Sequence, residues 1–314
     1  MLLLYFGAEW LVKGSSELAL SFGIRPIVIG LTVVAFGTSA PELVISVVSS
    51  LQGKSMIAVG NVVGSNICNI GLVLGLAALF NPIVSQKSVV RQDIPIMLGI
   101  SLYLLLISFG STLGRFEGAT LFGGLLVYLY FNYFSAVKLQ PETAAEGASS
   151  GSDLNGEESN RSGVGQILLI IIGIAAVVGG AQIVVDCAEK IMKIFGVSEK
   201  FIGLTMVAFG TSLPELATSV VAAIRKEMDI SLGNLIGSNV FNIMGVLGAA
   251  ALIKPIQIPG GFVQSGLLID YLVMIFISAL PWFMLRKDLT ISRADGAVLL
   301  SCYGGYIFYL ILKL

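Results

Sequence analysis

Two glutamates, Glu42 and Glu215, lie in the middle of long apolar stretches and are the first residues to suggest a chemistry. A charged side chain at the centre of a membrane helix costs roughly 3 kcal/mol on insertion scales, so it indicates a function. A structural ion pair would need a basic partner, but lysine and arginine are absent from residues 26–53, 56–80, 201–224 and 229–252. Two such carboxylates must share a proton or bind a cation from solution, and we interpret them as a cation-binding pair.

Hydroxyl and amide side chains recur at helical spacing around these glutamates. The spacing i, i+4, i+8 places side chains on one helical face. Hard cations such as calcium take six to eight oxygen ligands, which these groups can offer. For the serines and threonines alone, hydrogen bonding between helices is the alternative; the matching glutamates favour an ion site. The faces comprise Thr38, Glu42 and Ser46; Thr211, Glu215 and Ser219; Asn61, Ser65 and Asn69; and Asn234, Ser238 and Asn242.

Proline directly precedes each glutamate, at Pro41 and Pro214. Proline lacks an N–H donor, and its ring clashes with the carbonyl four residues earlier. We therefore expect each helix to break there and to free carbonyl oxygens beside the glutamate, which membranes tolerate only around a cavity or inside protein. The paired glycines of 60–64 and 233–237 predict close approach of the next helix.

The elements that position these residues are membrane helices. The chain has 314 residues, of which 56% are hydrophobic and 12% charged, with a mean hydropathy of +0.93; soluble domains carry about 25% charged residues. A membrane helix needs roughly 20 apolar residues, whereas barrel strands need roughly 10. Ten stretches qualify: 1–22, 26–53, 56–80, 94–113, 116–137, 164–194, 199–224, 229–252, 263–285 and 292–312.

An internal repeat organises these stretches. Residues 7–83 align without a gap on 180–256. Five spans per repeat force the second copy to enter the membrane from the opposite side, as in inverted-repeat transporters. The predicted fold is an all-α membrane protein of ten transmembrane helices, with repeats at 1–138 and 163–314 and with helices 2 and 7 broken at the midplane.

The segment between the repeats, 139–162, is rich in serine, glycine and acid, which predicts a disordered linker. Ten lysines and arginines fall on its side of the membrane and seven on the other. By the positive-inside rule the linker is cytoplasmic and both termini are outside. We expect a multi-pass protein of the cell membrane whose first span is not a cleaved signal.

The paired motifs resemble those of the calcium/cation antiporter superfamily, specifically its sodium/calcium exchanger branch. The resemblance spans nearly the whole chain and lies in two Gly-Thr-Ser-x-Pro-Glu segments, 37–42 and 210–215, and two Gly-Asn-x-x-Gly-Ser-Asn-x-x-Asn segments, 60–69 and 233–242. It implies ten helices with an ion site where the repeats meet. The regulatory loop of animal exchangers is missing, so the resemblance is to the prokaryotic type.

The resemblance also implies ligands. It implies calcium binding by Glu42 and Glu215 with the backbone carbonyls of Thr38 and Thr211. It implies sodium sites that use Ser39, Ser65, Ser212, Ser238, Thr211, Asn69, Asn242 and the carbonyls of Ala35 and Ala208. Potassium-dependent relatives carry aspartate at the position of Asn242, so asparagine here implies potassium independence.

We therefore expect a sodium/calcium antiporter that works by alternating access and is electrogenic. The alternatives are a calcium/proton antiporter, in which protons replace sodium on the same glutamates, and a cation channel. An enzyme is not expected, because the chain has no histidine and no nucleophile–base pair. The expected partners are calcium and sodium ions and the lipid bilayer; with a net charge of -1 we expect no nucleic acid, and neither a cofactor nor an obligatory protein partner.

Overall fold

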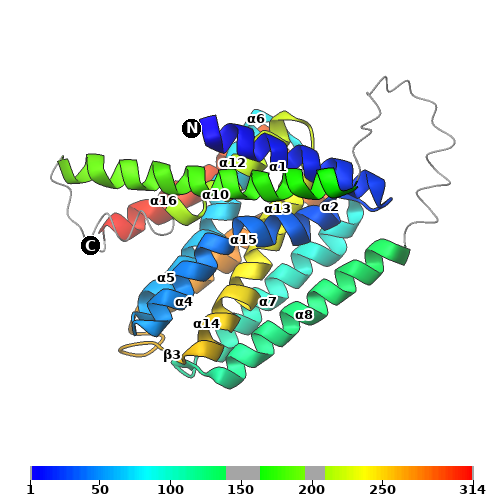
Figure 1. The fold of residues 1–314 in the computed structure, drawn as a ribbon. Helices are drawn as coiled ribbons and strands as arrows, with labels where there is room; N and C mark the ends of the chain where they lie inside the picture. The colour runs from blue at the N-terminus through cyan, green and yellow to red at the C-terminus, as the bar shows by residue number, and fades with distance from the viewer. Residues whose placement is uncertain (1, 139–162, 195–208, 313–314) are drawn as a thin grey trace, which may run out of the picture.

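The computed structural model describes residues 2–138, 163–194 and 209–312, and these are almost entirely helical (Figure 1). By length and composition, six of the described helices could cross a membrane, or seven if one bent pair counts as a single span. Helix occupies all ten predicted stretches, although residues 199–208 lie outside the described part. The protein is therefore a helical membrane protein, and its layout is consistent with two five-helix repeats.

The first half holds eight α-helices, three π-helical segments and two short strands: α1 (Leu2–Ser21), α2 (Pro26–Ile29), η1 (Gly30–Val34), α3 (Ala35–Thr38), α4 (Ala40–Leu51), α5 (Ser55–Cys68), η2 (Asn69–Leu74), α6 (Gly75–Phe80), β1 (Ile83–Val84), η3 (Val89–Asp93), α7 (Ile94–Ser108), β2 (Thr112–Leu113) and α8 (Arg115–Lys138).

The described second half is built in the same order. Its elements are α10 (Gly163–Ile194), α12 (Leu213–Ile224), α13 (Met228–Val240), η4 (Phe241–Leu247), α14 (Gly248–Ile253), β3 (Ile256–Gln257), α15 (Leu267–Asp288), β4 (Thr290–Ile291) and α16 (Arg293–Leu312). The predicted linker, 139–162, lies outside the described residues.

The structure contains the predicted helix break just before each of the two glutamates. Residues Pro26–Thr38 and Ala40–Leu51 form two helical pieces bent by 46°. The residue between them, Ser39, has φ -80° and ψ 4°, and its counterpart Ser212 has φ -83° and ψ 3°. The predicted break is therefore confirmed at both proline positions.

Glycines let α13 press against the first broken helix. A Cβ atom at Gly233 would lie 2.6 Å from the carbonyl oxygen of Ile27, and one at Gly237 would lie 2.6 Å from that of Leu31. The predicted close approach is thus confirmed for 233–237. For 60–64, the equivalent partner segment lies outside the described residues, so the prediction stands untested.

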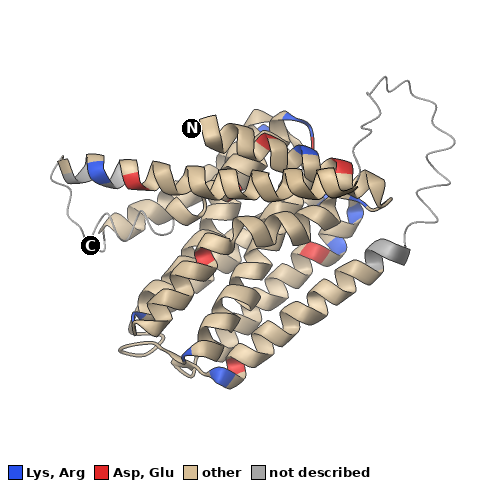
Figure 2. Ribbon diagram, viewed as in Figure 1, with Lys and Arg blue, Asp and Glu red and all other residues tan. Residues whose placement is uncertain are grey.

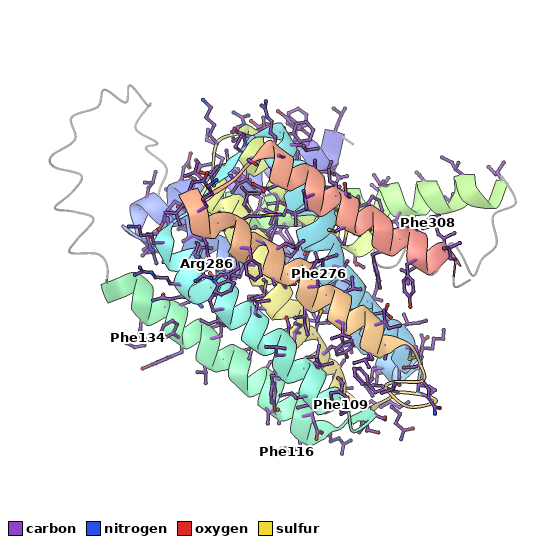
Figure 3. The ribbon with its side chains drawn as sticks, turned by 180° about the vertical axis from the view of Figure 1, so that it is seen from behind. Phe109, Phe116, Phe134, Phe276, Arg286 and Phe308 are labelled. Carbon is purple, nitrogen blue, oxygen red and sulfur yellow. The ribbon has the colours of Figure 1, made fainter. Side chains whose placement is uncertain are left out.

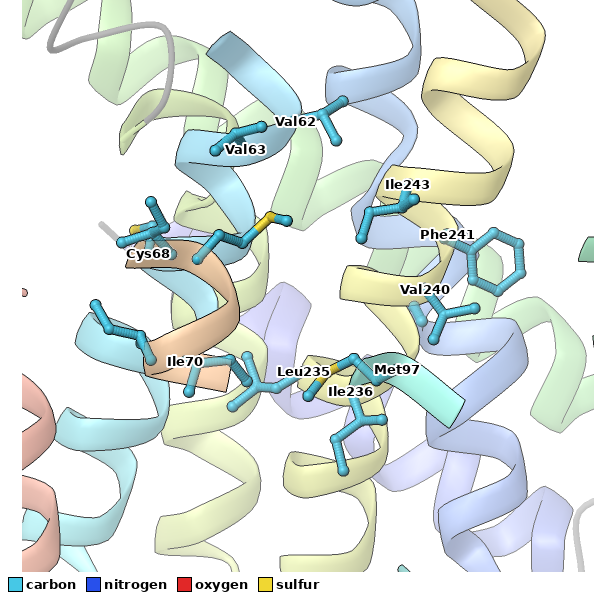
Figure 4. Close-up of a cluster of buried hydrophobic side chains, with 14 of the residues drawn as sticks. Val62, Val63, Cys68, Ile70, Met97, Leu235, Ile236, Val240, Phe241 and Ile243 are labelled. Atoms are coloured by element: carbon cyan, nitrogen blue, oxygen red, sulfur yellow. The ribbon is translucent and has the colours of Figure 1, made fainter. Parts of the chain in front are cut away.

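Figure 1 shows α1 and α10 side by side, running across the helices α4, α5, α7 and α8. Their backbones touch, since a Cβ atom at Gly173 would lie 2.7 Å from the backbone nitrogen of Leu11. A buried apolar cluster that includes Val62 of α5, Met97 of α7 and Leu235 of α13 packs these helices together (Figure 4). These helices form the rigid frame of the candidate site.

The outer surface suits lipid. Large apolar side chains such as Phe116, Phe276 and Phe308 project outward (Figure 3) and are largely exposed. Charged residues gather mainly near helix ends, with long uncharged stretches between them (Figure 2). A soluble protein rarely exposes so much contiguous apolar surface.

Two short antiparallel strand pairs join the repeats, a feature that the all-α prediction lacked. β1 pairs with β4, and β2 pairs with β3. Each pair takes one strand from each half of the chain. The pairing satisfies backbone groups at the points where helices end.

Candidate cation-binding site

Glu42 and Glu215 are completely buried and face each other across the two repeats. Each lies in the first turn of the helix that follows a break, α4 or α12, where the helix dipole favours negative charge. Glu42 neighbours the hydroxyls of Ser65 and Thr211. Ser39, three residues before Glu42, donates to Glu215 Oε1 at 3.3 Å, so the two glutamates lie near each other. The breaks therefore bring both predicted carboxylates to one place.

Several buried oxygens at this place have no hydrogen-bond partner among the described residues. A buried polar atom without a partner costs roughly 1–3 kcal/mol, more if it is charged. All of these atoms can accept a hydrogen bond or bind a cation, and a cation would satisfy several of them at once. They are both carboxylate oxygens of Glu42, Oε2 of Glu215, Oδ1 of Asn69 and of Asn242, and Oγ of Ser212.

The site carries two negative charges and otherwise neutral oxygens. Within the described residues, no group of three or more histidine, cysteine, aspartate or glutamate side chains could hold a metal. The donors are hard oxygens, which suit calcium and sodium rather than soft metals. The residues present therefore fit a hard cation that balances two charges.

The helical faces predicted from the spacing meet across the repeats. Thr38 Oγ1 donates to Asn234 Oδ1 at 3.1 Å, and Thr211 Oγ1 donates to Asn61 Oδ1 at 3.2 Å. The hydroxyls of Thr38 and Ser238 are 3.4 Å apart, and those of Ser65 and Thr211 are 3.3 Å apart.

Some of the residues on these faces support the site instead of lining it. Asn61 Nδ2 donates to Ser46 Oγ at 2.9 Å, and Asn234 Nδ2 donates to Ser219 Oγ at 3.1 Å. Ser46 and Ser219 therefore fit the alternative interpretation, in which hydroxyl groups make hydrogen bonds between helices. They hold the asparagines that in turn receive the threonine hydroxyls.

The serines of the two breaks differ from each other. Ser39 Oγ donates to Glu215 Oε1 at 3.3 Å, whereas Ser212 Oγ has no partner among the described residues. The carbonyl of Ala35 accepts the backbone N–H of Ser39 at 3.0 Å. It also accepts the hydroxyl of Thr38 at 3.4 Å. Its role as an ion ligand stays a prediction, as do those of the Thr38 and Thr211 carbonyls. Ala208 lies outside the described residues.

Asn69 and Asn242 each have a buried Oδ1 without a hydrogen-bond partner among the described residues, whereas the Nδ2 atom of each is held by another asparagine. Asn69 Nδ2 donates to Asn239 Oδ1 at 3.1 Å, and Asn242 Nδ2 donates to Asn66 Oδ1 at 3.0 Å. A π-helical segment begins at Asn69 in one half and at Phe241 in the other, and such segments are frequent at functional sites. The sequence predicted neither the π-helices nor a role for Asn66 and Asn239, although the repeated motif contains both asparagines.

Charges on α1 lie apart from this site. Lys13 and Glu17 pair within the helix at 3.9 Å, while Glu9 pairs with Arg225 and Ser16 donates to Glu227 at 2.9 Å. These contacts tie α1 to the loop between α12 and α13. They do not involve the unpaired oxygens of the site.

Comparisons with known proteins identify the family. The family model for sodium/calcium exchanger protein matches residues 1–134 and 165–312. The inner membrane protein YrbG of Escherichia coli is 37% identical over 312 residues, covering 99% of this chain and 93% of YrbG. The sodium/calcium exchanger MaX1 of Methanosarcina acetivorans is 32% identical over 333 residues, covering 97% of this chain and 94% of MaX1.

A solved structure is also similar over the whole chain. The sodium-calcium exchanger NCX_Mj, soaked with sodium and calcium ions, matches with a TM-score of 0.82 and 34% sequence identity. The match covers 98% of this chain and 94% of NCX_Mj. The fold similarity therefore extends across both halves of the chain.

Proposed function

The chain belongs to the sodium/calcium exchanger protein family, and we propose that it exchanges sodium ions for calcium across a membrane through the Glu42–Glu215 site. The family consists of transporters, so the chain is not an enzyme. The proposed ligands are those that the resemblance implies, with the two carboxylates at the centre.

One observation carries the proposal: three of the four oxygens of Glu42 and Glu215 are buried without a hydrogen-bond partner among the described residues. Two ionised carboxylates in a dry interior repel each other and lose their hydration, which is unfavourable by several kcal/mol per ion. A bound cation from solution offsets both effects. The surrounding hydroxyl and amide oxygens complete its coordination shell.

Charge balance implies the mode of exchange. One calcium ion neutralises a site of charge -2, and three sodium ions exceed neutrality by one. Both ions compete for the same oxygens, so they cannot be bound together, and exchange by alternating access follows. With that ratio one net positive charge crosses the membrane in each cycle, which makes the exchange electrogenic. Its movement through 100 mV is worth roughly 2.3 kcal/mol.

Potassium is not required on this proposal. Asn242 contributes a neutral amide oxygen, so no third carboxylate calls for a further monovalent cation. The amide nitrogen of Asn242 is already held by Asn66. A neutral ligand keeps the site charge at -2.

The proposed topology has the repeats at 1–138 and 163–314, with the segment 139–162 in the cytoplasm and both termini outside the cell membrane. The support is the distribution of lysine and arginine in the sequence. Modification of single cysteines introduced at position 150 and near the C-terminus, in a chain whose own cysteines are replaced, would test the orientation from each side.

The test of the function is calcium uptake into liposomes that contain the purified protein. Uptake should require an outwardly directed sodium gradient, saturate with calcium, and respond to an imposed membrane potential. Uptake driven by a proton gradient without sodium would identify a calcium/proton antiporter instead. Uptake that needs no counter-ion and does not saturate would identify a channel.

A further inference from the structure

We propose that Asn66 and Asn239 are positioning residues that determine which atom of Asn242 and Asn69 faces the ions. This inference rests on the proposed function, because it assigns the way in which two of its ligands are held. Neither asparagine lines the site with an unpaired atom. Both are almost completely buried, at 1% and 0% exposure, between α5 and α13.

The amides of Asn66 and Asn239 are each oriented by the backbone of the other residue. Asn66 Nδ2 donates to the carbonyl oxygen of Asn239 at 3.3 Å, and Asn239 Nδ2 donates to the carbonyl oxygen of Asn66 at 3.3 Å. A carbonyl oxygen only accepts, so each amide must turn its nitrogen toward the opposite backbone. The methionine sulfurs of Met274 and Met97, also acceptors, lie 3.7 Å from the same two nitrogens.

The fixed orientation of Asn66 then determines the orientation of Asn242. With its nitrogen fixed, Asn66 must present Oδ1 on its other side, where Asn242 Nδ2 donates to it at 3.0 Å. Asn242 therefore directs its own Oδ1 away from Asn66. In the same way Asn239 fixes Asn69, whose Nδ2 donates to Asn239 Oδ1 at 3.1 Å.

The result is two buried amide oxygens that remain available to a cation. Oδ1 of Asn69 and Oδ1 of Asn242 are both buried and have no partner among the described residues. If either amide rotated by half a turn, it would present two N–H donors to the ions, which would repel a cation. The site therefore requires each amide to present its oxygen, and not its nitrogen, to the ions.

Each positioning asparagine holds an amide ligand of the other repeat. Asn66, in the first repeat, holds Asn242 of the second, although it is three residues from Asn69 on its own helix. Asn239 likewise holds Asn69 and not its neighbour Asn242. A general packing role for Asn66 would disturb its sequence neighbour at least as much as a residue in the other repeat.

Replacing Asn66 by leucine removes the acceptor and keeps the volume nearly constant. The backbone carbonyl of Asn66 remains, so Asn239 keeps its own donor contact and still holds Asn69. Asn242 alone loses its partner and becomes free to rotate. Outer contacts to ion ligands typically change affinity by 10–100-fold, so we expect the half-saturating sodium concentration to rise about 10-fold.

The experiment is a double-mutant cycle on sodium-driven calcium uptake in liposomes. Asn66→Leu and Asn242→Leu should be non-additive, with the double variant shifted no further than the larger single shift. Asn66→Leu and Asn69→Leu should be additive, so that their fold-changes multiply. The mirrored pair, Asn239→Leu with Asn69→Leu, should again be non-additive.

Ser101→Ala serves as the matched control. Ser101 is buried, and among the described residues its hydroxyl bonds only to the Met97 carbonyl of its own helix, at 2.9 Å. This variant should leave the sodium dependence unchanged. If Asn66→Leu does not fold, as judged by gel filtration, Asn66→Ala takes its place in the cycle because it adds no bulk.

The outcomes separate the two proposals. A wild-type protein without sodium-driven uptake contradicts the proposed function itself. An active wild type in which Asn66→Leu leaves the sodium dependence unchanged overturns the positioning role. Coupling of Asn66 to Asn69 in place of Asn242 also overturns it.

Discussion

The inner helices of the two repeats make nearly the same contacts, whereas the outer helices α1 and α10 do not. Around the site, each threonine of one repeat donates to an asparagine of the other, at 3.1 Å from Thr38 and 3.2 Å from Thr211. The support contacts of the two asparagines, at 2.9 and 3.1 Å, match as closely. One shared site explains this agreement, because each half supplies the same oxygens to it.

The outer helices share a glycine-mediated packing but differ in their charges. On α1, Glu9 pairs with Arg225 of the other repeat. On α10, Asp186 accepts a hydrogen bond from Gln182 of its own helix at 2.8 Å. We infer that the ion site constrains the inner helices to a common pattern and leaves the charges of the outer helices free to diverge.

The largest expected effect comes from removing either carboxylate. Glu42→Gln or Glu215→Gln should abolish calcium binding and exchange, because a site of charge -1 cannot neutralise a divalent ion. The fold should survive, since neutralising a buried charge removes a desolvation cost. Calcium uptake and gel filtration together check both statements.

Glu117→Gln is the control for these variants. Glu117 lies in the first turn of α8, where its carboxylate accepts the backbone N–H of Gly114 at 2.9 Å. This variant should transport calcium like the wild type. Loss of transport in Glu117→Gln, or transport retained in Glu42→Gln, would contradict the assignment of the site.

A change at Asn242 should break the equivalence of the two halves. Asn242→Asp adds a third carboxylate, so an extra monovalent cation is needed for neutrality. The wild type should transport equally well with potassium replaced by choline on both sides, while the variant should depend on a further monovalent cation. Asn69→Asp is the matched variant and should behave similarly if the two halves are equivalent. A wild-type calcium flux that stops when potassium is removed would contradict the prediction of potassium independence.

The paired serines offer a finer comparison. Ser65→Ala and Ser238→Ala each remove a hydroxyl near a glutamate of the site. We expect the half-saturating sodium concentration to rise about 5-fold in each, the equivalent of one hydrogen bond of about 1 kcal/mol, with a smaller change for calcium. Titrations of uptake against each ion test this, and an equal loss for both ions would argue against separate sodium sites.

Much of the fold and of the site could be predicted from sequence, since the signals are local. Apolar runs locate the helices, and the prolines locate both breaks. The matching polar faces locate most of the oxygens. What the sequence could not give is which atom of each amide faces the ions, because that depends on contacts between helices α5 and α13 from different repeats.

The sequence also did not reveal that the segments following the aligned regions, which include α7 and α15, are equivalent in the two repeats. Asp270 had no counterpart in the ungapped alignment, which ends near residue 256. In the structure, the amide of Asn239 contacts the sulfur of Met97, and the amide of Asn66 contacts that of Met274 in the same way. Asp93 and Asp270 each lie four residues before one of these methionines and are therefore equivalent. The spacing between the repeats grows by four residues in the intervening loops, which an alignment without gaps cannot follow.

The smallest expected effect concerns an outer contact. Arg225→Gln removes the ion pair with Glu9, in which the arginine side chain is 50% exposed. Exposed ion pairs contribute about 0–1 kcal/mol, so the free energy of unfolding should fall by less than about 1 kcal/mol and ion affinities should not change. Thermal unfolding in detergent and sodium titrations measure both, and a changed ion affinity would mean that the outer helices do influence the site.

The central claim is that one pair of glutamates binds both ions in turn. Equilibrium binding of radioactive calcium to the purified protein tests it most directly, with sodium varied at constant ionic strength. The account predicts saturable calcium binding that sodium displaces completely, and no binding to Glu42→Gln or Glu215→Gln. Calcium binding that persists in saturating sodium, or in either variant, would contradict it.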